Sequence, residues 1–373
     1  GTIEQVFIGY DQQQNPQYKP QCTKCKTQNL PQLILGGGAA GGGKAGLLDS
    51  KACTPFGFRK IRDLKVGDII SSATTGRQQR IIWLHPIEEH DYYRIHFIDG
   101  THYDCSSGHL WQLHLSRKRT KRKDAEGNVC NERIWSARMI HDWICRKKSG
   151  MYKGMNLIIP LCAPVQFTVG NRYKQTKPIE PYVLGALLGD GCITRSVIEA
   201  NAVQLTTMDD EIVQKFMQYG YDMGHSQAKA GSRAKSYMIY NQALVEALCN
   251  LKLSGCDSSN KFIPDQYKLA TIEERKRLIQ GIMDTDGYVD ERGHISYCTT
   301  SRRLADDVAF IIRSLGGIAT VKRNPSGYRD RSGCRVKCND SYDVYIRTRM
   351  NPDLVSLSRK RCRCRHEYNG GVS

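Results

Sequence analysis

Residues Tyr182–Gly191 read YVLGALLGDG, and residues Leu278–Gly287 read LIQGIMDTDG. The two stretches lie 96 residues apart, and each is an apolar segment that ends in Asp-Gly, so the chain contains an internal repeat. Each stretch predicts a helix, followed by a β segment at 202–207 or 294–300, a second helix, and a strand at 235–240 or 342–348. We therefore expect an α-β-β-α-β-β pattern twice, at about 180–255 and 274–350.

Small residues stand on one face of each predicted helix. Gly185 and Gly189 are four residues apart, and Gly281 and Thr285 repeat this spacing. A glycine inside a helix costs about 1 kcal/mol relative to alanine, so the paired occurrence needs a compensating reason. Close packing of the two helices, backbone against backbone, supplies one.

Two carboxylates end these helices. Asp190 and Asp286 each stand before a glycine, which is typical of a helix C-terminus, where the helix dipole opposes negative charge. If the helices pack side by side in parallel, the carboxylates converge, and divalent cations would relieve their repulsion. One Asp-Gly pair more often merely ends a helix, but two in matching contexts favour a metal-dependent phosphodiesterase site, with Mg²⁺ activating the water that attacks a DNA phosphate.

The composition favours a nucleic-acid partner. The 373 residues include 55 Lys and Arg against 37 Asp and Glu, a net charge of +18, and such an excess attracts a polyanion. No window approaches the roughly 18 to 20 uninterrupted apolar residues of a membrane span. There is no basic-then-apolar leader, and the fifteen cysteines are scattered, so we expect an intracellular, cytoplasmic protein with free thiols and no membrane contact. Zinc on Cys22 and Cys25 with a distant cysteine pair is the disfavoured alternative.

A glycine-rich run precedes the first predicted domain. Gly38, Gly43 and Lys44 match the phosphate-binding pattern G-x-x-x-x-G-K-[S/T], but Ala45 stands where a hydroxyl should bind Mg²⁺. No long amphipathic helix follows to receive a phosphate. The loop is therefore interpreted as interrupted, which disfavours an active P-loop ATPase, and a flexible glycine linker is the open alternative.

Residues 45–166 are expected to be mostly β. Segments 92–97 and 101–105 flank Asp99-Gly100, a strong hairpin signal, and 156–160 predicts a short strand before a linker. The basic run 117–123 is more often a solvated loop than a DNA contact.

The repeated segments resemble the paired signature of LAGLIDADG homing endonucleases of the single-chain, two-repeat type, over about 167–350. The resemblance implies that Asp190 and Asp286 bind the catalytic metal, with Gly189 and Thr285 directly before them at the same metal sites. It also implies that Lys261, in an N-K-F-I-P segment similar to the family's K-x-I-P, organises the attacking water or polarises the phosphate. Each repeat's sheet should lie in the DNA major groove.

Residues 45–166 resemble the N-terminal part of the Hint splicing domain of inteins. The K-V-G-D at 65–68 is similar to a turn in the first splicing block, and Ser106-Ser107-Gly108-His109 is similar to the T-x-x-H block. His109 would then activate the N-terminal scissile amide. Ala45 stands at the nucleophile position and cannot perform an acyl shift, so it is either an altered nucleophile or the first residue of an intein that starts differently. No His-Asn pair occurs, and we expect the sequence to be a fragment.

The predicted chain is thus multidomain: a mostly-β, horseshoe-like Hint domain plus an α+β LAGLIDADG endonuclease with pseudo-twofold αββαββ repeats. The expected function is metal-dependent double-strand cleavage of DNA by a monomer with a pseudo-dimeric nuclease, from a phage, prophage or microbial gene. The host resembles a phage terminase large subunit. The alternatives are a terminase-type ATPase and a LAGLIDADG protein that binds nucleic acid without cutting. The expected ranges are 1–44 for the host fragment, 45–166 for the splicing region, 167–350 for the endonuclease and 351–373 for a basic tail.

Overall fold

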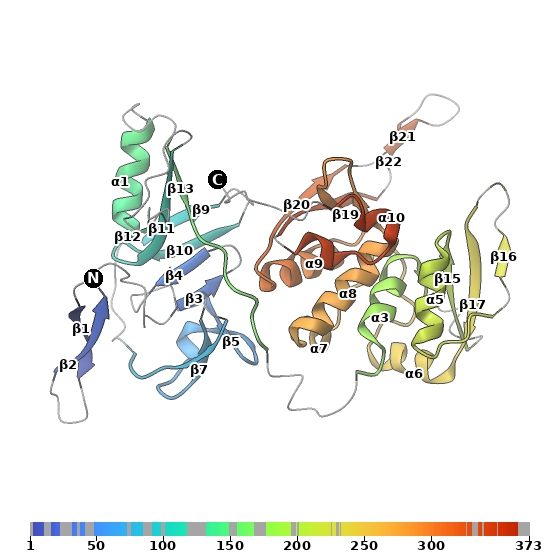
Figure 1. Cartoon of the computed structure of the whole chain (residues 1–373), viewed down its shortest axis with the longest axis horizontal. Coiled ribbons are helices and arrows are strands. Elements are labelled where there is room, and N and C mark those ends of the chain that lie inside the picture. The colour runs from blue at the N-terminus through green and yellow to red at the C-terminus, as the bar shows by residue number, and fades with distance from the viewer. Residues whose placement is uncertain are drawn as a thin grey trace. The chain divides into compact units, whose positions relative to one another are not determined.

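In the computed structural model, the described part of the chain divides by its internal contacts into two units, with the boundary between Gln166 and Phe167 (Figure 1). Each unit is described by itself. The structure describes residues 3–10, 16–22, 32–35, 38–41, 48–72, 76–84, 92–97, 101–117, 132–148, 155–167, 177–194, 199, 201–224, 226–228, 231, 233–325, 327–329, 335–337, 339–348 and 350–364.

Unit 1 consists mainly of antiparallel strand pairs. One sheet has the order β12-β11-β4-β3, and β13 also pairs with β11. The predicted hairpin is confirmed as β9 and β10, and the strand predicted at 156–160 is β13. Its strands and short helix are β1 (Ile3–Tyr10), β2 (Pro16–Cys22), β3 (Gln32–Leu35), β4 (Gly38–Gly41), β5 (Lys51–Thr54), β6 (Gly57–Lys60), η1 (Ile61–Asp63), β7 (Ile69–Ser71), β8 (Gln78–Arg80), β9 (Tyr92–His96), β10 (His102–Ser106), β11 (Leu110–Arg117), β12 (Glu132–Ser136) and β13 (Met155–Ile158).

Unit 1 also contains a helix that the mostly-β interpretation left out. Helix α1 spans Ala137–Lys148. Ala137, Ile140 and Trp143 recur every three residues and are buried, so one apolar face of α1 packs on the unit's core. The helix begins after Ser136, whose hydroxyl accepts a hydrogen bond from the Met139 amide at 3.2 Å.

The glycine-rich run departs from the predicted phosphate loop. Gly38 begins strand β4, which pairs with β3 and with β11. A phosphate-binding loop directs its backbone N–H groups at the ligand. In β4 the backbone is used for pairing with the neighbouring strands instead. The other members of the predicted loop remnant, Gly43 and Lys44, and the predicted nucleophile position Ala45, lie outside the described residues.

Unit 2 contains the predicted repeat. Two four-stranded antiparallel sheets have the orders β14-β15-β17-β16 and β18-β19-β23-β20, so the α-β-β-α-β-β prediction is confirmed in both halves. Repeat 1 comprises α3 (Pro181–Gly189), β14 (Gly191–Cys192), β15 (Ala202–Thr207), α5 (Asp210–Gln218), β16 (Ser226–Ala228), β17 (Lys235–Tyr240) and α6 (Gln242–Asn250). After α7 (Asp265–Lys268), repeat 2 comprises α8 (Ile272–Thr285), β18 (Gly287–Val289), β19 (Ile295–Thr299), α9 (Arg302–Ser314), β20 (Ile318–Asn324), β21 (Gly327–Arg329), β22 (Arg335–Lys337) and β23 (Ser341–Arg347).

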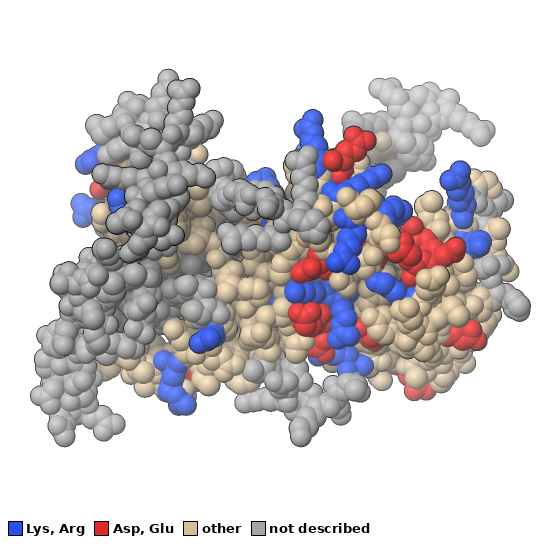
Figure 2. Space-filling model, viewed as in Figure 1, with Lys and Arg blue, Asp and Glu red and all other residues tan. Residues whose placement is uncertain are grey.

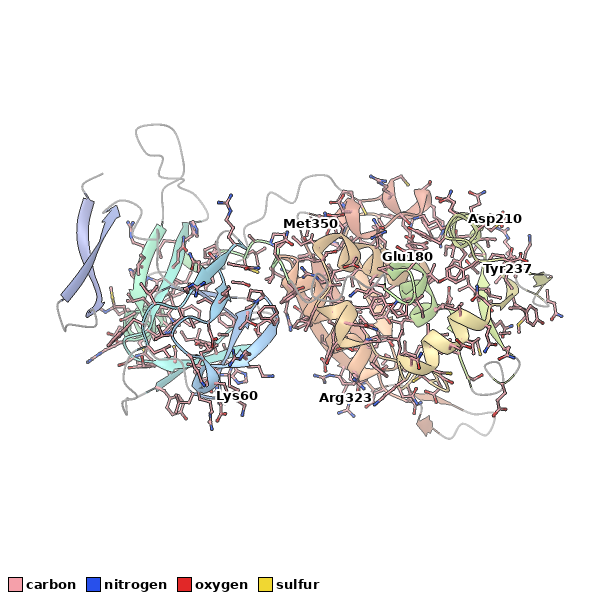
Figure 3. The ribbon with its side chains drawn as sticks, turned by 90° about the horizontal axis from the view of Figure 1, so that it is seen from below. Lys60, Glu180, Asp210, Tyr237, Arg323 and Met350 are labelled. Atoms are coloured by element: carbon pink, nitrogen blue, oxygen red, sulfur yellow. The ribbon has the colours of Figure 1, made fainter. Side chains whose placement is uncertain are left out.

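Helices α3 and α8 run through the core of unit 2, and each has a defined start. The Glu180 carboxylate accepts hydrogen bonds from the amides of Tyr182 and Val183 at 2.6 and 3.2 Å, which caps α3. Figure 3 labels Glu180 beside α3. Thr271 and Glu274 form a capping box before α8. Because α3 is apolar on all sides, it is buried on all sides.

The two helices lie side by side in parallel, as predicted (Figure 1). A Cβ built on Gly185 would lie 2.1 Å from the Leu278 carbonyl oxygen, and one built on Gly281 would lie 2.1 Å from the Tyr182 carbonyl oxygen. Four residues further along, a Cβ on Gly189 would lie 2.0 Å from the Thr285 hydroxyl. Only glycine permits this approach, and it brings the ends of the two helices together.

The predicted basic tail is wrong for residues 351–364, which belong to unit 2. They form η2 (Asn351–Leu354) and α10 (Ser358–Arg361). Leu354, Val355 and Leu357 are buried in the core of unit 2 and supply the apolar surface that holds the segment in place.

Within the described residues, no helix combines the length and the apolar character that crossing a membrane requires.

Candidate functional site

The site lies where α3 and α8 end. Asp190 and Asp286 are the C-terminal caps of the two helices, and their amides donate to Ala186 and Ile282 at 3.1 Å. Their carboxyl groups lie close enough to change one another's pKa. The structure thus brings together the two carboxylates that the repeat predicted to converge.

The pair is electrostatically strained in the absence of a cation. Burial, and then the charge of Asp286, raise the pKa of Asp190 from 3.8 to about 6. Burial also raises the pKa of Asp286, against the opposing charges of Lys261 and Lys360. Two buried carboxylates in contact cannot both ionise without cost, so the pair retains a proton at a pH where isolated carboxylates have lost theirs.

Lys261 lies at this site, where the resemblance placed it. It is buried, and its Nζ donates to the carbonyl oxygens of Leu187, Gly189 and Gly191 at 3.0, 3.0 and 2.7 Å. Burial lowers its pKa, while the charges of both aspartates raise it. All three ammonium protons therefore point at the C-terminal turn of α3, where a positive charge is favourable.

Lys360 is the counterpart of Lys261 in repeat 2, and sequence reasoning missed it. Its Nζ donates to the carbonyl oxygens of Met283, Asp284 and Gly287 at 2.7 Å and of Thr285 at 3.2 Å. Burial lowers its pKa to about 8. A signal was present, because Lys360 follows Lys261 by 99 residues, close to the 96 that separate the aspartates.

Each lysine segment is held by the opposite repeat. The Ser301 hydroxyl, at the start of α9 in repeat 2, donates to the Lys261 carbonyl at 2.6 Å. At the start of α5 in repeat 1, Asp209 forms two 2.7 Å hydrogen bonds with the guanidinium of Arg359. Both lysines therefore bind the helix end of their own repeat, while the opposite repeat contacts the segment that carries each of them.

The two residues predicted beside the aspartates are partly engaged. The carbonyl oxygens of Gly189 and Thr285 accept from Lys261 and Lys360 at 3.0 and 3.2 Å. The Thr285 hydroxyl donates within its own helix, at 3.0 Å from the carbonyls of Gly281 and Ile282. Each carbonyl retains a second lone pair, but an adjacent ammonium disfavours a cation there.

The donor set suits a hard divalent cation. Among the described residues, no three His, Cys, Asp or Glu side chains come together as a metal site. Asp190 and Asp286 offer carboxylate oxygens, and the remaining ligands would come from water and phosphate, which is the usual coordination of Mg²⁺. The mutual repulsion of the pair gives a reason for a cation to bind.

The outward faces of the two sheets carry polar and aromatic side chains. Residues on the inward faces, such as Leu205 and Val344, are buried in the core. Outward-facing residues alternate with these buried residues along each strand. Across each sheet, outward-facing residues of neighbouring strands stand opposite one another. These outward residues are Gln204, Thr206, Ser236, Met238 and Tyr240 in repeat 1, and Tyr288, Ser296, Cys298, Thr320, Lys322, Asp343, Tyr345 and Arg347 in repeat 2.

Charge is mixed rather than uniform on the face of unit 2 that Figure 2 shows, where Lys and Arg side chains lie between Asp and Glu. Among the described residues of unit 2, some charged side chains form ion pairs, such as Arg359 with Asp209 at 2.7 Å and Lys268 with Asp307 at 2.8 Å. Charges that are already paired contribute less to the attraction of a polyanion. That attraction therefore depends on the excess of basic over acidic residues, which gives the net charge of +18.

The predicted splicing residues of unit 1 lie at the end of β10 and in the turn between β10 and β11. Ser106 ends β10 and is buried, and its carbonyl accepts from the amide of His109 at 3.1 Å. The His109 ring is buried between Tyr103 and Trp111, at centroid distances of 5.6 and 5.5 Å. Leu110, next to His109, pairs with Gly41, four residues before Ala45.

The K-V-G-D stretch forms the predicted turn. Gly67 has a φ of +95°, which favours glycine, and the Asp68 carboxylate accepts from the Lys65 amide at 2.9 Å.

Comparison with known proteins supports the repeat region most directly. Residues 273–350 match the family model described as LAGLIDADG-like domain. The chain is 27% identical over 288 residues to a replicative DNA helicase DnaB of Mycobacterium intracellulare, covering 74% of this chain and 43% of the helicase. It is 28% identical over 150 residues to the homothallic switching endonuclease of Saccharomyces cerevisiae, covering 38% of this chain and 25% of that protein.

Among solved structures, the homing endonuclease I-DmoI in complex with its target DNA and Mn is similar at 16% identity, with a TM-score of 0.32. That similarity covers 48% of this chain and 91% of I-DmoI. The chain spans less than half the length of the curated relatives it matches. The LAGLIDADG-like match begins at the second residue of α8 and ends at the end of repeat 2, so it contains Asp286 but neither lysine.

Proposed function

We propose that this chain is a site-specific DNA endonuclease of the LAGLIDADG type, carried within a protein-splicing element. The observation that carries the proposal is the duplicated centre, with one carboxylate and one buried lysine at the end of each of two parallel helices. The LAGLIDADG-like match and the similarity to a yeast endonuclease support the same activity. The proposed substrate is double-stranded DNA, because two centres related by a pseudo-twofold suit two antiparallel strands.

The main role of the chain's own residues would be to position the cation and the charged groups around the scissile phosphate. Asp190 and Asp286 would hold the divalent cation, which when bound supplies activation of water and stabilisation of the leaving oxygen. Lys261 and Lys360 place a positive charge beside each carboxylate, which favours the ionised form that a cation needs. A hydrogen bond from either lysine to a scissile phosphate would replace one of its carbonyl bonds.

Binding would use the outward faces of the sheets. Aromatic side chains there are exposed, with Tyr240 and Tyr288 at 69% and 59%. Exposed polar and aromatic groups on a twisted sheet suit contact with base edges, while Lys322 and Arg347 suit phosphates. The net charge of +18 would supply the non-specific part of the affinity.

The splicing context rests on unit 1 and on how the relatives match. Similarity over most of this chain to less than half of a replicative helicase, and to an endonuclease as well, is what an element inserted into unrelated host genes would produce. The pairing of Gly41 with Leu110 supports a junction close to His109. Ala45 offers no nucleophilic atom, so we propose cleavage of DNA as the activity of this chain, and a Hint-type unit whose N-terminal acyl shift does not operate in the usual way. A terminase-like host is the corresponding proposal for residues 1–44.

The test is incubation of the full chain with linear and supercoiled DNA that carries the host coding sequence joined across the insertion point. We expect a double-strand break there with Mg²⁺ and none with EDTA. Asp190→Asn serves as the inactive control. DNA that binds but stays intact with every divalent cation tried would support the non-cleaving alternative, and a cut that survives Asp190→Asn would refute the assigned centre.

A further inference from the structure

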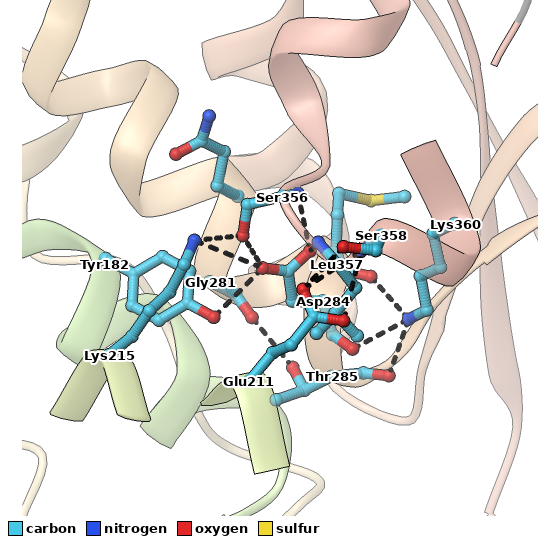
Figure 4. A network of polar contacts seen from close by, with 12 residues as sticks. Tyr182, Glu211, Lys215, Gly281, Asp284, Thr285, Ser356, Leu357, Ser358 and Lys360 are labelled. Carbon is cyan, nitrogen blue, oxygen red and sulfur yellow. Dashed lines mark hydrogen bonds and ion pairs between the residues drawn. The ribbon is translucent and has the colours of Figure 1, made fainter. Parts of the chain in front are cut away.

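Asp284 is a buried charge that the proposed reaction does not use. Its side chain is fully inaccessible to solvent. Its carboxylate accepts hydrogen bonds from the Tyr182 hydroxyl at 2.9 Å, from the Ser356 amide at 2.8 Å and from the Leu357 amide at 3.1 Å, and also from the Ser356 hydroxyl (Figure 4). A buried carboxyl group with this many donors is held in one position.

The two amide donors belong to the segment that carries Lys360. Leu357 is the residue before α10, and its carbonyl accepts from the Lys360 amide at 3.0 Å. The Lys360 ammonium in turn donates to the Asp284 carbonyl at 2.7 Å. Asp284 therefore contacts this segment twice, with its side chain at the start and with its backbone at the lysine head group.

Repeat 1 completes the network. The Lys215 ammonium, on α5, lies 4.0 Å from the Asp284 carboxylate and donates to the Ser356 hydroxyl (Figure 4). It also lies over the Tyr182 ring, 4.3 Å from the centroid. Removing a partner from such a buried set leaves a charge or a donor unsatisfied, so the segment and the carboxylate depend on one another.

Helix α3 of the first centre carries no carboxylate at the equivalent position. Leu188 occupies the position in α3 that Asp284 occupies in α8, two residues before the metal-site aspartate, and it is buried among apolar side chains. The Lys261 segment is held instead by Asp307 of α9, whose carboxylate accepts from the Ile263 amide at 2.9 Å. The two centres therefore place equivalent lysines by different means.

We propose that Asp284 is a positioning residue for the second centre, and that its carboxylate fixes Ser356 and Leu357 so that Lys360 lies at the end of α8. The inference rests on the proposed function, because it assigns the second centre's cleavage of one DNA strand to this network. Asp284 itself does not touch substrate or cation. Loss of the Asp284 carboxylate should slow cleavage of one DNA strand, while the first centre still cuts the other.

The placement of Lys360 can be measured without activity. The full-length protein is treated briefly with an amine-acetylating reagent, and modification of each lysine is followed by mass spectrometry. In the parent, Lys360 and Lys261 are both expected to be protected, since both are buried. In Asp284→Asn, acetylation of Lys360 should rise by about tenfold or more, the scale of losing a charge-assisted hydrogen bond, while Lys261 stays protected.

Strand-resolved cleavage then tests the consequence. With each DNA strand labelled separately, Lys360→Met identifies the strand that the second centre cuts. Asp284→Asn should slow the same strand by about tenfold or more and leave the other within about threefold, so that nicked DNA accumulates. Ser356→Ala removes only a hydroxyl. It should also raise the acetylation of Lys360 and slow the same DNA strand, but by less than Asp284→Asn does. Asp307→Asn is the matched control and should slow the opposite strand.

The outcomes separate the possible failures. Exposure of both lysines in Asp284→Asn, or equal slowing of both strands, would show general destabilisation and overturn the proposal. Unchanged protection of Lys360 would overturn it as well. If the parent cuts neither strand with Mg²⁺, the proposed function fails, while the acetylation result still decides whether Asp284 positions Lys360.

Discussion

Replacing Asp190 with asparagine is expected to stabilise the cation-free protein at neutral and alkaline pH while it removes DNA cleavage. The cause is the raised pKa of Asp190, which burial and the neighbouring Asp286 lift from 3.8 to about 6. Asparagine keeps the size of the side chain and cannot ionise. Ionised Asp190 therefore lowers the free energy of unfolding of unit 2 at neutral and alkaline pH.

The magnitude follows from that pKa. Each pKa unit is worth about 1.4 kcal/mol, so ionising Asp190 in the folded chain costs up to about 3 kcal/mol. Because the pKa is raised on folding, the stability is fully present below the unfolded value near 3.8 and is lost as the pH rises through 6. Water reaches part of the site, so we expect Asp190→Asn to gain roughly 1 to 3 kcal/mol at pH 8 and less than about 0.5 kcal/mol near pH 4.

The assay is urea unfolding in EDTA at the two pH values, followed by tryptophan fluorescence and circular dichroism. At each pH, the free energy of unfolding of the parent is subtracted from that of the variant. The value at pH 4 is then subtracted from the value at pH 8, which cancels effects of the substitution that do not depend on ionisation. Adding Mg²⁺ should stabilise the parent more than the variant. A variant that is equally or less stable than the parent at pH 8, or a pH-independent difference, would refute the reasoning.

Two further predictions concern packing and charge. Gly281→Ala should lower the free energy of unfolding by about 1 to 3 kcal/mol, since its Cβ would lie 2.1 Å from the Tyr182 carbonyl and the helices must separate. Thermal unfolding measures this, and Gly108→Ala, whose Cβ meets nothing within 4 Å, should change stability far less; equal effects would contradict close packing as the cause. Binding to DNA of arbitrary sequence should weaken by at least about tenfold between 50 and 200 mM KCl, measured by fluorescence anisotropy, and a salt-independent affinity would exclude phosphate contacts as its source.

The repeat and its carboxylates could be predicted from the sequence because they are encoded locally. Strands β15 and β17 have the predicted ends, and Asp190 and Asp286 lie where the pattern of apolar residues and Asp-Gly placed them. Periodicity fixes which face of a helix is buried, and a duplicated pattern fixes which two helices pair.

Contacts between distant segments could not be predicted in this way. Lys360 stands in a run of arginines and lysines that is typical of a solvated tail, and only the fold shows its ammonium buried against α8. The sequence pattern assigns no role to Asp284, because its partner Ser356 lies 72 residues away. Helix α1 was not predicted, because its short apolar face of Ala137, Ile140 and Trp143 stands within a region expected to be mostly β.

The crossed attachment of the two lysine segments bears on how such a chain could be rebuilt from parts. A chimera that takes one repeat from another protein would keep that repeat's helix end, and repeat 2 would also keep Asp284, but the contacts from the opposite repeat would be lost, since Ser301 binds the Lys261 carbonyl and Asp209 binds Arg359, next to Lys360. Transplantable modules in unit 2 therefore do not coincide with its structural repeats. Each exchanged half would have to bring the first turn of the other half's second helix with it.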